Sequence, residues 1–273
     1  MLRLTNVTFE PDQLISSPLI AETVSAIPES SGREFFTQKL ETARLSSVQG
    51  IRVSYRTTKG KHSTEDEMYY DLGPKPVITA VSHGALADSL YPVRFKPDFT
   101  PASFEHTYRS RVEGLDFDER YVYESARSTV FTDLKAKRSQ RFTNDSSFAD
   151  SVTMMEYLVF VDTSQLKELR MSTAVSPGAI RLPFIFRRIG EARVSDLAGR
   201  LHDCWVYEAE IDNLLSVLVK LFYGSATLWV MKDFPHLRVK MDFFHKTAML
   251  KDYEINPTGA SAIALQAPAA TTF

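Results

Sequence analysis

Most of the chain after Gly50 consists of short runs in which apolar and polar side chains alternate. In "IRVSYR" (51–56) every second residue is apolar or aromatic, and the same period returns over 104–109 and 180–186. A period of two is that of a β-strand with one face in water. Turn residues separate most runs. We therefore predict a mainly β fold: a large curled antiparallel sheet, either a half-barrel or a lipocalin-like barrel, wrapping one or two helices.

Two segments have helical periodicity instead. Over 33–46 the apolar residues are spaced three or four positions apart, which predicts a short amphipathic helix. The segment 145–162, "DSSFADSVTMMEYLVFVD", opens with residue types common at helix N-caps and continues with a helical apolar face. This second helix is the one we expect the sheet to embrace. The run 212–224, "DNLLSVLVKLFYG", fits either a short helix or a buried strand.

Prolines and small residues suggest the larger divisions of the chain. Residues 90–103 carry three prolines, which predicts an edge strand or a loop, because proline cannot donate to a ladder. We expect an N-terminal arm and short helix over 1–50, an antiparallel β domain over 51–255 and a disordered tail over 256–273. The β domain is either single or built of two similar halves, 51–118 and 119–255.

Composition and charge exclude several classes of protein. The 273 residues carry a net charge of −2, from 32 basic and 34 acidic side chains. Such a balance, without a long basic stripe, argues against nucleic acid as a partner. No apolar run approaches the length of a membrane helix, and the first residues do not resemble a secretory signal. We therefore expect a cytoplasmic protein with no membrane span.

Four segments in order, "SVTMMEYL", "GAIRLPFIFRRIGEARV", "DLAGRLHDCWVYEAE" and "ATLWVMKDFPHLRVKMDF", resemble a family of bacterial envelope domains of unknown function. That family is built as a long curled antiparallel sheet around a helix, similar to lipoprotein-carrier half-barrels. The resemblance covers residues 120–245. It implies a curled sheet with an apolar concave face, and it assigns no site residue. Members of the family typically carry an export signal, which this sequence does not show.

The sequence lacks the common catalytic motifs. It has no glycine-rich nucleotide loop, no Gly-x-Ser-x-Gly elbow and no His-Glu-x-x-His pair. The six histidines are dispersed, and the single cysteine, Cys204, excludes an internal disulfide bond. Cys204 fits a small buried side chain better than a reactive thiol. We accordingly expect neither a metal nor a cofactor.

Aromatic residues on the predicted strands are the best candidates for a ligand site. Rings with a hydroxyl or an indole N–H can line an apolar pocket and orient what it binds. The predicted ligand-binding residues are Tyr108, Tyr121, Trp205, Tyr207 and Trp229. Ordinary packing in the core or on the sheet surface is the alternative for each of them.

Three further residues could make such a pocket catalytic. His106 lies between aromatic neighbours at period two, where an imidazole is either hydrogen-bonded core or a general base. Tyr123 could donate a proton if it lies near a carboxylate. Glu156, on the predicted internal helix, lies either on a water-exposed face or inside the sheet, where burial raises the pKa of a carboxyl group.

The stretch "KDFPH" (232–236) separates two apolar runs and predicts the turn of a hairpin. Pro235 suits the second position of a turn over Phe234–Leu237, although an aromatic–proline bond there could also be cis. We expect His236 to be a turn residue that faces solvent, and Arg238 to lie on the wet face of the following strand.

Two functions fit these features. The first is binding of a hydrophobic small molecule or lipid in an aromatic-lined pocket on the concave face of the sheet. The second is a cofactor-independent cyclase or isomerase of secondary metabolism, acting on a polyketide- or terpene-like substrate through shape and acid/base catalysis. The sequence does not decide between a binding protein and an enzyme.

Overall fold

The structure is a computed structural model that describes residues 42–45, 47–84, 87–95, 101–110, 118–125, 128–143, 156–175, 180–211, 226–243 and 246–257. Its strands form one 14-stranded sheet in which neighbouring strands are antiparallel. The predicted fold class, a mainly β protein with a large antiparallel sheet, is confirmed.

The sheet consists of two meandering runs of strands. The first run comprises β1 (Gly50–Lys59), β2 (His62–Asp71), β3 (Val77–Gly84), β4 (Ala87–Phe95), β5 (Pro101–Ser110), β6 (Asp118–Ser125), β7 (Ser128–Asp133) and β8 (Arg138–Thr143). The second run comprises β9 (Glu168–Val175), β10 (Ile180–Ser195), β11 (Leu201–Ile211), β12 (Ala226–Met231), β13 (Arg238–Phe243) and β14 (Lys246–Ile255). The first and last strands, β1 and β14, pair with each other and join the runs, which leaves β8 and β9 at the two ends of the strand order within the described chain.

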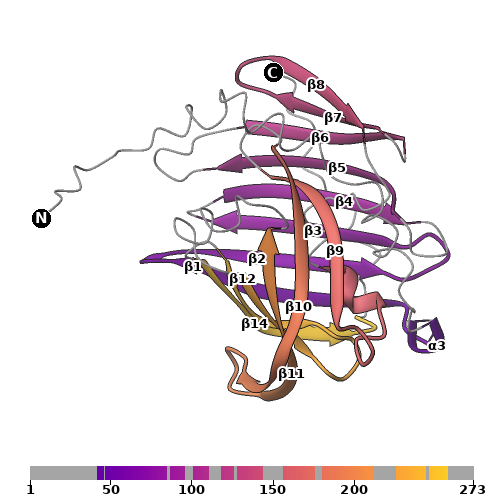
Figure 1. Ribbon diagram of the computed structural model, residues 1–273, viewed down its shortest axis with the longest axis vertical. Coiled ribbons are helices and arrows are strands. Elements are labelled where there is room, and N and C mark those ends of the chain that lie inside the picture. Colours follow the sequence, from indigo (N-terminus) through magenta and orange to yellow (C-terminus); the bar gives the residue numbers. More distant parts are fainter. Residues whose placement is uncertain are drawn as a thin grey trace, which may run out of the picture.

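The sheet is strongly curled. In Figure 1 the strands of the first run lie stacked across the view, while β9 and β10 cross the stack at a steep angle. One hydrophobic cluster joins side chains of both runs, from Ile78 on β3 and Phe131 on β7 to Phe186 on β10 and Leu250 on β14. The core therefore lies on the concave face, as the family resemblance implies.

Strand β1 shows how the sequence produces this arrangement. Ile51, Val53 and Tyr55 are buried, whereas Arg52 and Arg56 are exposed. Successive side chains of a strand point to opposite faces, so alternation in the sequence becomes one dry face and one wet face. Each fully buried side chain of this size contributes on the order of 1.5–3 kcal/mol to folding.

Helices form a small share of the described chain. The predicted helix over 33–46 is represented by α3 (Thr42–Leu45), and residues before Thr42 lie outside the described part. From the predicted helix over 145–162, the structure describes Glu156 onward. There the chain forms a short 3-10 helix, η3 (Tyr157–Phe160), and not a continued α-helix. The ambiguous run 212–224 and the tail from residue 258 lie outside the described residues. The proposed division into arm, β domain and tail stays a prediction.

The expectation for the proline-rich segment was wrong in one respect. Strand β4 contains Pro92 but lies inside the sheet, between β3 and β5. Pro92 is paired with Thr79 of β3, while the described pairs with β5 lie to either side of it, at Leu90 and Val93. In an antiparallel strand, the backbone N–H of each residue points toward only one of the two neighbouring strands. An interior strand can therefore contain a proline where the strand on that side accepts no hydrogen bond from this position.

The turn between β10 and β11 is organised by one buried carboxylate. Asp196 accepts hydrogen bonds from the backbone N–H groups of Ala198 and Arg200, both at 2.9 Å. The same carboxylate accepts from Arg200 Nε at 2.7 Å and lies 3.0 Å from His202 Nε2. Gly199 has a φ of +82°, a conformation that glycine adopts without strain. "DLAG" is thus a turn because of its aspartate and its glycine.

Candidate functional site

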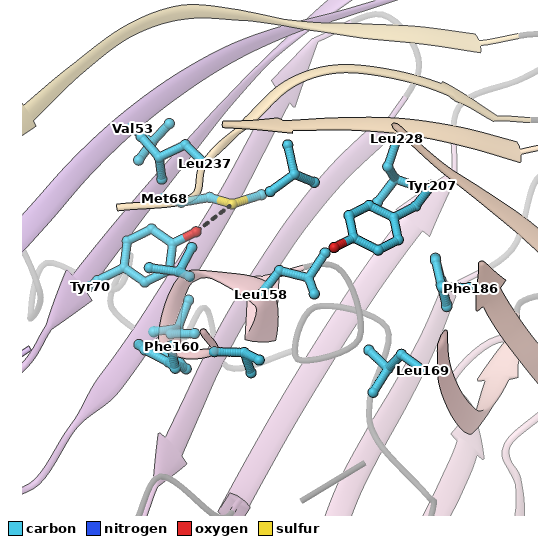
Figure 2. Packing of buried hydrophobic residues seen from close by; sticks show 14 of the residues in the cluster. Val53, Met68, Tyr70, Leu158, Phe160, Leu169, Phe186, Tyr207, Leu228 and Leu237 are labelled. Carbon is cyan, nitrogen blue, oxygen red and sulfur yellow. Dashed lines mark hydrogen bonds between the residues drawn. The ribbon is translucent and has the colours of Figure 1, made fainter. Parts of the chain in front are cut away.

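Residues 156–167, the described part of the segment that leads from the first run to the second, lie inside the concave face. Leu158, Phe160 and Leu166 are buried in the main hydrophobic cluster. Figure 2 shows Leu158 of η3 between Tyr70 of β2 on one side and Tyr207 of β11 on the other. The hydroxyl of Tyr207 donates to the backbone carbonyl of Leu166 at 3.3 Å. The segment is therefore held against both runs of the sheet.

A buried polar cluster lies where this segment meets the sheet. Glu156, the residue before η3, is 1% exposed, and Arg238, at the start of β13, is 6% exposed. Glu156 Oε1 lies 2.8 Å from Arg238 Nη2, an ionic contact. Its other oxygen, Oε2, accepts a hydrogen bond of 2.5 Å from the hydroxyl of Tyr70. Oε2 is thus hydrogen-bonded, whereas Oε1 has the ionic contact but no hydrogen bond of acceptable geometry among the described residues.

Tyr55 of β1 completes the cluster. The guanidinium carbon of Arg238 lies 4.5 Å from the centre of the Tyr55 ring, at cation–π distance. Among the described residues, neither the Tyr55 hydroxyl nor Arg238 Nε has a hydrogen-bond partner of acceptable geometry. We call Tyr55, Tyr70, Glu156 and Arg238 the interior polar cluster.

The environment fixes the protonation of three members of the cluster. Burial raises the pKa of Tyr70 well above its ordinary value, and the Glu156 carboxylate raises it further. Burial and the same carboxylate also raise the pKa of Tyr55. For Arg238, burial by itself lowers the pKa, but the combined attraction of Glu156, Tyr55, Tyr70 and Asp66 outweighs it, so the pKa rises. Both phenols therefore stay protonated hydrogen-bond donors, and the guanidinium stays charged.

This arrangement suits binding better than proton transfer. One carboxylate and one guanidinium balance each other, and the two phenols are neutral. Glu156 already interacts with Tyr70 and Arg238, and a proton accepted from a substrate would weaken both interactions. Donors without acceptors, by contrast, are available to a polar atom brought in from outside. Across the described residues, no three histidine, cysteine, aspartate or glutamate side chains are grouped as metal ligands.

The structure places the three predicted catalytic residues differently. Glu156 is buried in the interior polar cluster and does not lie on the water-exposed helix face that was the alternative. His106 on β5 is paired with Tyr121 of β6, and Tyr123 is paired with Thr129 of β7. The side chains of His106 and Tyr123 lie outside the described part of the structure. Their catalytic roles stay predictions.

Two of the predicted ligand-binding residues belong to the core. Tyr121 is buried, and its hydroxyl donates to Glu119 at 3.2 Å, with its ring 5.2 Å from that of Phe131. Tyr207 is also buried, with the hydrogen bond to Leu166 already given. Tyr108 is paired with Glu119 along the backbone, and its side chain lies outside the described part.

The two tryptophans are partly buried and lie next to cations. Arg188 Cζ is 4.2 Å, and Lys232 Nζ 4.3 Å, from the ring centre of Trp205. The indole Nε1 of Trp205 is buried with no hydrogen-bond partner among the described residues. Trp229 has Lys240 Nζ 4.5 Å from its ring centre. Both rings pack against the main cluster. A ligand-binding role for these residues stays a prediction.

Sequence analysis missed Arg238 and did not single out Tyr55 or Tyr70 for the site. The alternation around 237–243 predicted that Arg238 faces water, and this was wrong. Leu237, Arg238 and Val239 are all buried, so the start of β13 is covered on both faces. Glu156 gave a signal, because it is an isolated charge in an apolar run and such residues are rarely buried unless paired. Arg238 gave none, because it alternates regularly with Lys240 and Asp242.

His236 was also placed wrongly with respect to solvent. It is a turn residue, as predicted, but it is buried. Its Nδ1 lies 3.1 Å from the carbonyl oxygen of Met231 and 3.2 Å from Thr163 Oγ1. The Phe234–Pro235 bond is cis, and the turn runs from Asp233 to His236, so Pro235 is its third residue and not its second. The turn folds inward because the imidazole of His236 contacts the hydroxyl of Thr163 on the internal segment.

No helix in the described part of the chain is both long enough and apolar enough to cross a membrane. No protein-family model matches the sequence, and no curated protein matches it either. One similar solved structure is the crystal structure of a beta-barrel-like protein of domain of unknown function DUF1849 from Brucella abortus. It is 11% identical, with a TM-score of 0.49, over 77% of this chain and 99% of that chain. At this degree of similarity, no residue role is carried over.

Proposed function

We propose that the protein binds a hydrophobic small molecule or lipid inside the curled sheet. One observation carries the proposal: hydrogen-bond donors without acceptors, on Tyr55 and Arg238, lie within an otherwise apolar cluster. Ligand sites combine mostly apolar walls with a few polar groups that fix orientation. A buried donor left without an acceptor costs stability, so a ligand that supplies one gains affinity.

The aromatic residues of the concave face fit this proposal as the apolar walls. Tyr121 and Tyr207 belong to the same hydrophobic cluster as Tyr55 and Tyr70, and the ring of Trp205 packs against it. Trp229 alternates on β12 with the buried Leu228 and Val230 and pairs with Lys240, so it points to the opposite face of the sheet. We propose that the rings of Tyr121, Trp205 and Tyr207 contact the apolar body of the ligand. The same proposal keeps the expected cytoplasmic location, which cell fractionation would test.

A cofactor-independent cyclase or isomerase is the second candidate. The observation in its favour is a carboxylate, Glu156, buried beside a tyrosine hydroxyl. Groups of this kind can handle protons within an apolar cavity. Against it, Glu156 already interacts with Tyr70 and Arg238. Loss of a product formed in cell extract on Glu156→Gln, with hydrophobic binding retained, would favour the enzyme.

Extraction of the purified full chain tests binding. Native mass spectrometry should show a fraction of the protein with added mass, and organic extraction followed by mass spectrometry should release an apolar molecule. Titration with the neutral fluorophore N-phenyl-1-naphthylamine should saturate at a single site. Arg193→Ala, which removes an exposed charge far from the core, should behave like the parent protein. A ligand-free protein that shows no saturable binding of the fluorophore would contradict the proposal.

A further inference from the structure

We propose that the interior polar cluster binds the carbonyl oxygen of an uncharged, otherwise apolar ligand, such as an ester or a ketone. This inference rests on the proposed function and specifies the chemistry and orientation of its ligand. The residues that would contact the oxygen are Tyr55, through its hydroxyl, and Arg238, through Nε.

The hydrogen-bond inventory of the cluster favours an acceptor. A protonated tyrosine can donate one hydrogen bond, and a guanidinium only donates. The Tyr70 hydroxyl donates to Glu156 Oε2. Glu156 Oε1 has no hydrogen bond of acceptable geometry among the described residues, but its charge is compensated by Arg238 Nη2 at 2.8 Å. The Tyr55 hydroxyl and Arg238 Nε lack partners in the described chain. A carbonyl oxygen has two lone pairs and can accept from both groups at once.

The charges already present in the cluster favour an uncharged ligand. The guanidinium of Arg238 is already balanced by Glu156 at 2.8 Å. The half-buried Asp66 adds a further negative charge near Arg238. A carboxylate or phosphate would therefore lie beside Glu156 and be repelled by its negative charge. An ammonium group would lie beside Arg238 and be repelled by its positive charge. Repulsion of this kind is strong in a buried site, where the effective dielectric constant is low.

The position of the cluster sets the orientation of the ligand. Tyr55 is on β1, Tyr70 on β2 and Arg238 on β13, and Glu156 directly precedes η3. The cluster therefore lies near the junction where β1 and β14 join the two runs, with apolar residues such as Val53, Leu158 and Leu237 in the same interior. We infer that the carbonyl end points to this junction and the apolar body lies along the concave face.

Four ligands with chains of equal length test the inference. They are methyl palmitate, with a carbonyl; hexadecanol, with a hydroxyl; hexadecyl methyl ether, with an ether oxygen only; and palmitate, with a charge. The affinity of each ligand is measured by its ability to displace N-phenyl-1-naphthylamine from the full-length protein. We expect methyl palmitate to bind about tenfold tighter than the ether, the effect of roughly one net hydrogen bond, and also tighter than hexadecanol and palmitate.

Substitutions and spectroscopy assign the contact to named groups. In Tyr55→Phe the preference for methyl palmitate over the ether should fall, while binding of the ether is unchanged. The infrared C=O stretch of bound ester, labelled with carbon-13, should be lower than in an apolar solvent and should rise in Tyr55→Phe. Tyr69→Phe is the matched control, because Tyr69 lies next to Tyr70 and is bonded to Glu67 outside the cluster.

The outcomes separate the two proposals. If none of the four ligands displaces the fluorophore, and the fluorophore itself does not bind, the proposed function fails. If the four bind equally, with no shift of the C=O stretch, the protein is a hydrophobic-ligand binder but the carbonyl site is wrong. Tighter binding of palmitate or of hexadecanol than of the ester would also overturn the carbonyl assignment.

Discussion

Glu156, just before the 3-10 helix η3, and Arg238, at the start of β13, form an ion pair inside the sheet, with Oε1 and Nη2 2.8 Å apart. The pair ties the internal segment to the second run of strands. Through the hydroxyl of Tyr70, the same carboxylate is also tied to the first run. Three parts of the chain that are distant in sequence therefore share one buried charge pair.

Removing one partner of this pair should destabilise the protein strongly. Arg238→Met leaves the buried charge of Glu156 without its partner, and Glu156→Gln leaves that of Arg238. For each variant we expect a loss of about 3–5 kcal/mol in the free energy of unfolding. The double variant should recover most of the loss, because two neutral side chains replace the pair. Urea denaturation of the four proteins measures this as a double-mutant cycle.

The exposed pair Arg193–Asp203 serves as the control for that cycle. Both side chains are largely exposed, at 67% and 59%, so Arg193→Ala should change the free energy of unfolding by less than about 1 kcal/mol. Equal effects of Arg193→Ala and Arg238→Met would contradict the importance of the buried pair.

The two tyrosines of the cluster should respond in opposite ways to removal of their hydroxyl groups. Tyr70→Phe deprives the buried Glu156 of a hydrogen bond and should cost about 1–3 kcal/mol. Tyr55→Phe removes a hydroxyl without a partner and should be neutral or slightly stabilising in the ligand-free protein. Thermal and urea unfolding of Tyr55→Phe and Tyr70→Phe measure the two changes in stability. A large loss in Tyr55→Phe would show that its hydroxyl is already bonded.

Protonation of Asp196 at low pH should lower the stability of the protein. Burial by itself raises the pKa of Asp196, but hydrogen bonds from His202 and Arg200 outweigh it and lower the pKa below the value of an unfolded aspartate. The stabilisation is therefore fully present above the unfolded value, about 3.9. It is lost as the pH falls through the folded-state value.

Urea denaturation at neutral pH and in steps below about pH 4 measures this contribution. Asp196→Asn should be less stable than the parent at neutral pH, and the difference should shrink as the solution is acidified. A difference that stays constant with pH would mean that the Asp196 carboxylate is not what stabilises the β10–β11 turn.

The thiol of Cys204 should be inert in the folded protein. Burial raises its pKa to about 12, and the carboxylate of Asp203 adds to the effect. The thiolate is the reactive form, so it is scarce at neutral pH. We expect Ellman's reagent to label Cys204 slowly in the native protein and rapidly in denaturant. Native labelling as fast as that of the unfolded chain would contradict the burial of Cys204.

Local periodicity was sufficient for the strands. Alternation over 51–56 predicted both β1 and its dry face, because a strand directs successive side chains to opposite sides whatever it later packs against. The hairpin turn was likewise visible, predicted over 234–237 and found over 233–236, since proline acts on the backbone close to its own position.

The candidate site depended on contacts between distant segments. Alternation showed that Arg238 and Val239 lie on different faces of β13, but not that both faces are covered. Whether a face is covered depends on the internal segment and on the curl of the sheet. For the same reason His236 was expected in solvent, although Thr163 lies against it. Pro92 was expected at an edge, although β4 has neighbours on both sides.

The sequence by itself thus determined the class of fold, most strand positions and the dry face of strands such as β1, all of which follow from local backbone and side-chain chemistry. Only the tertiary structure decided which polar groups are enclosed together. Tyr55, Tyr70, Glu156 and Arg238 come from four separate elements, and a charge is stable in an apolar interior only where folding brings its partner to it.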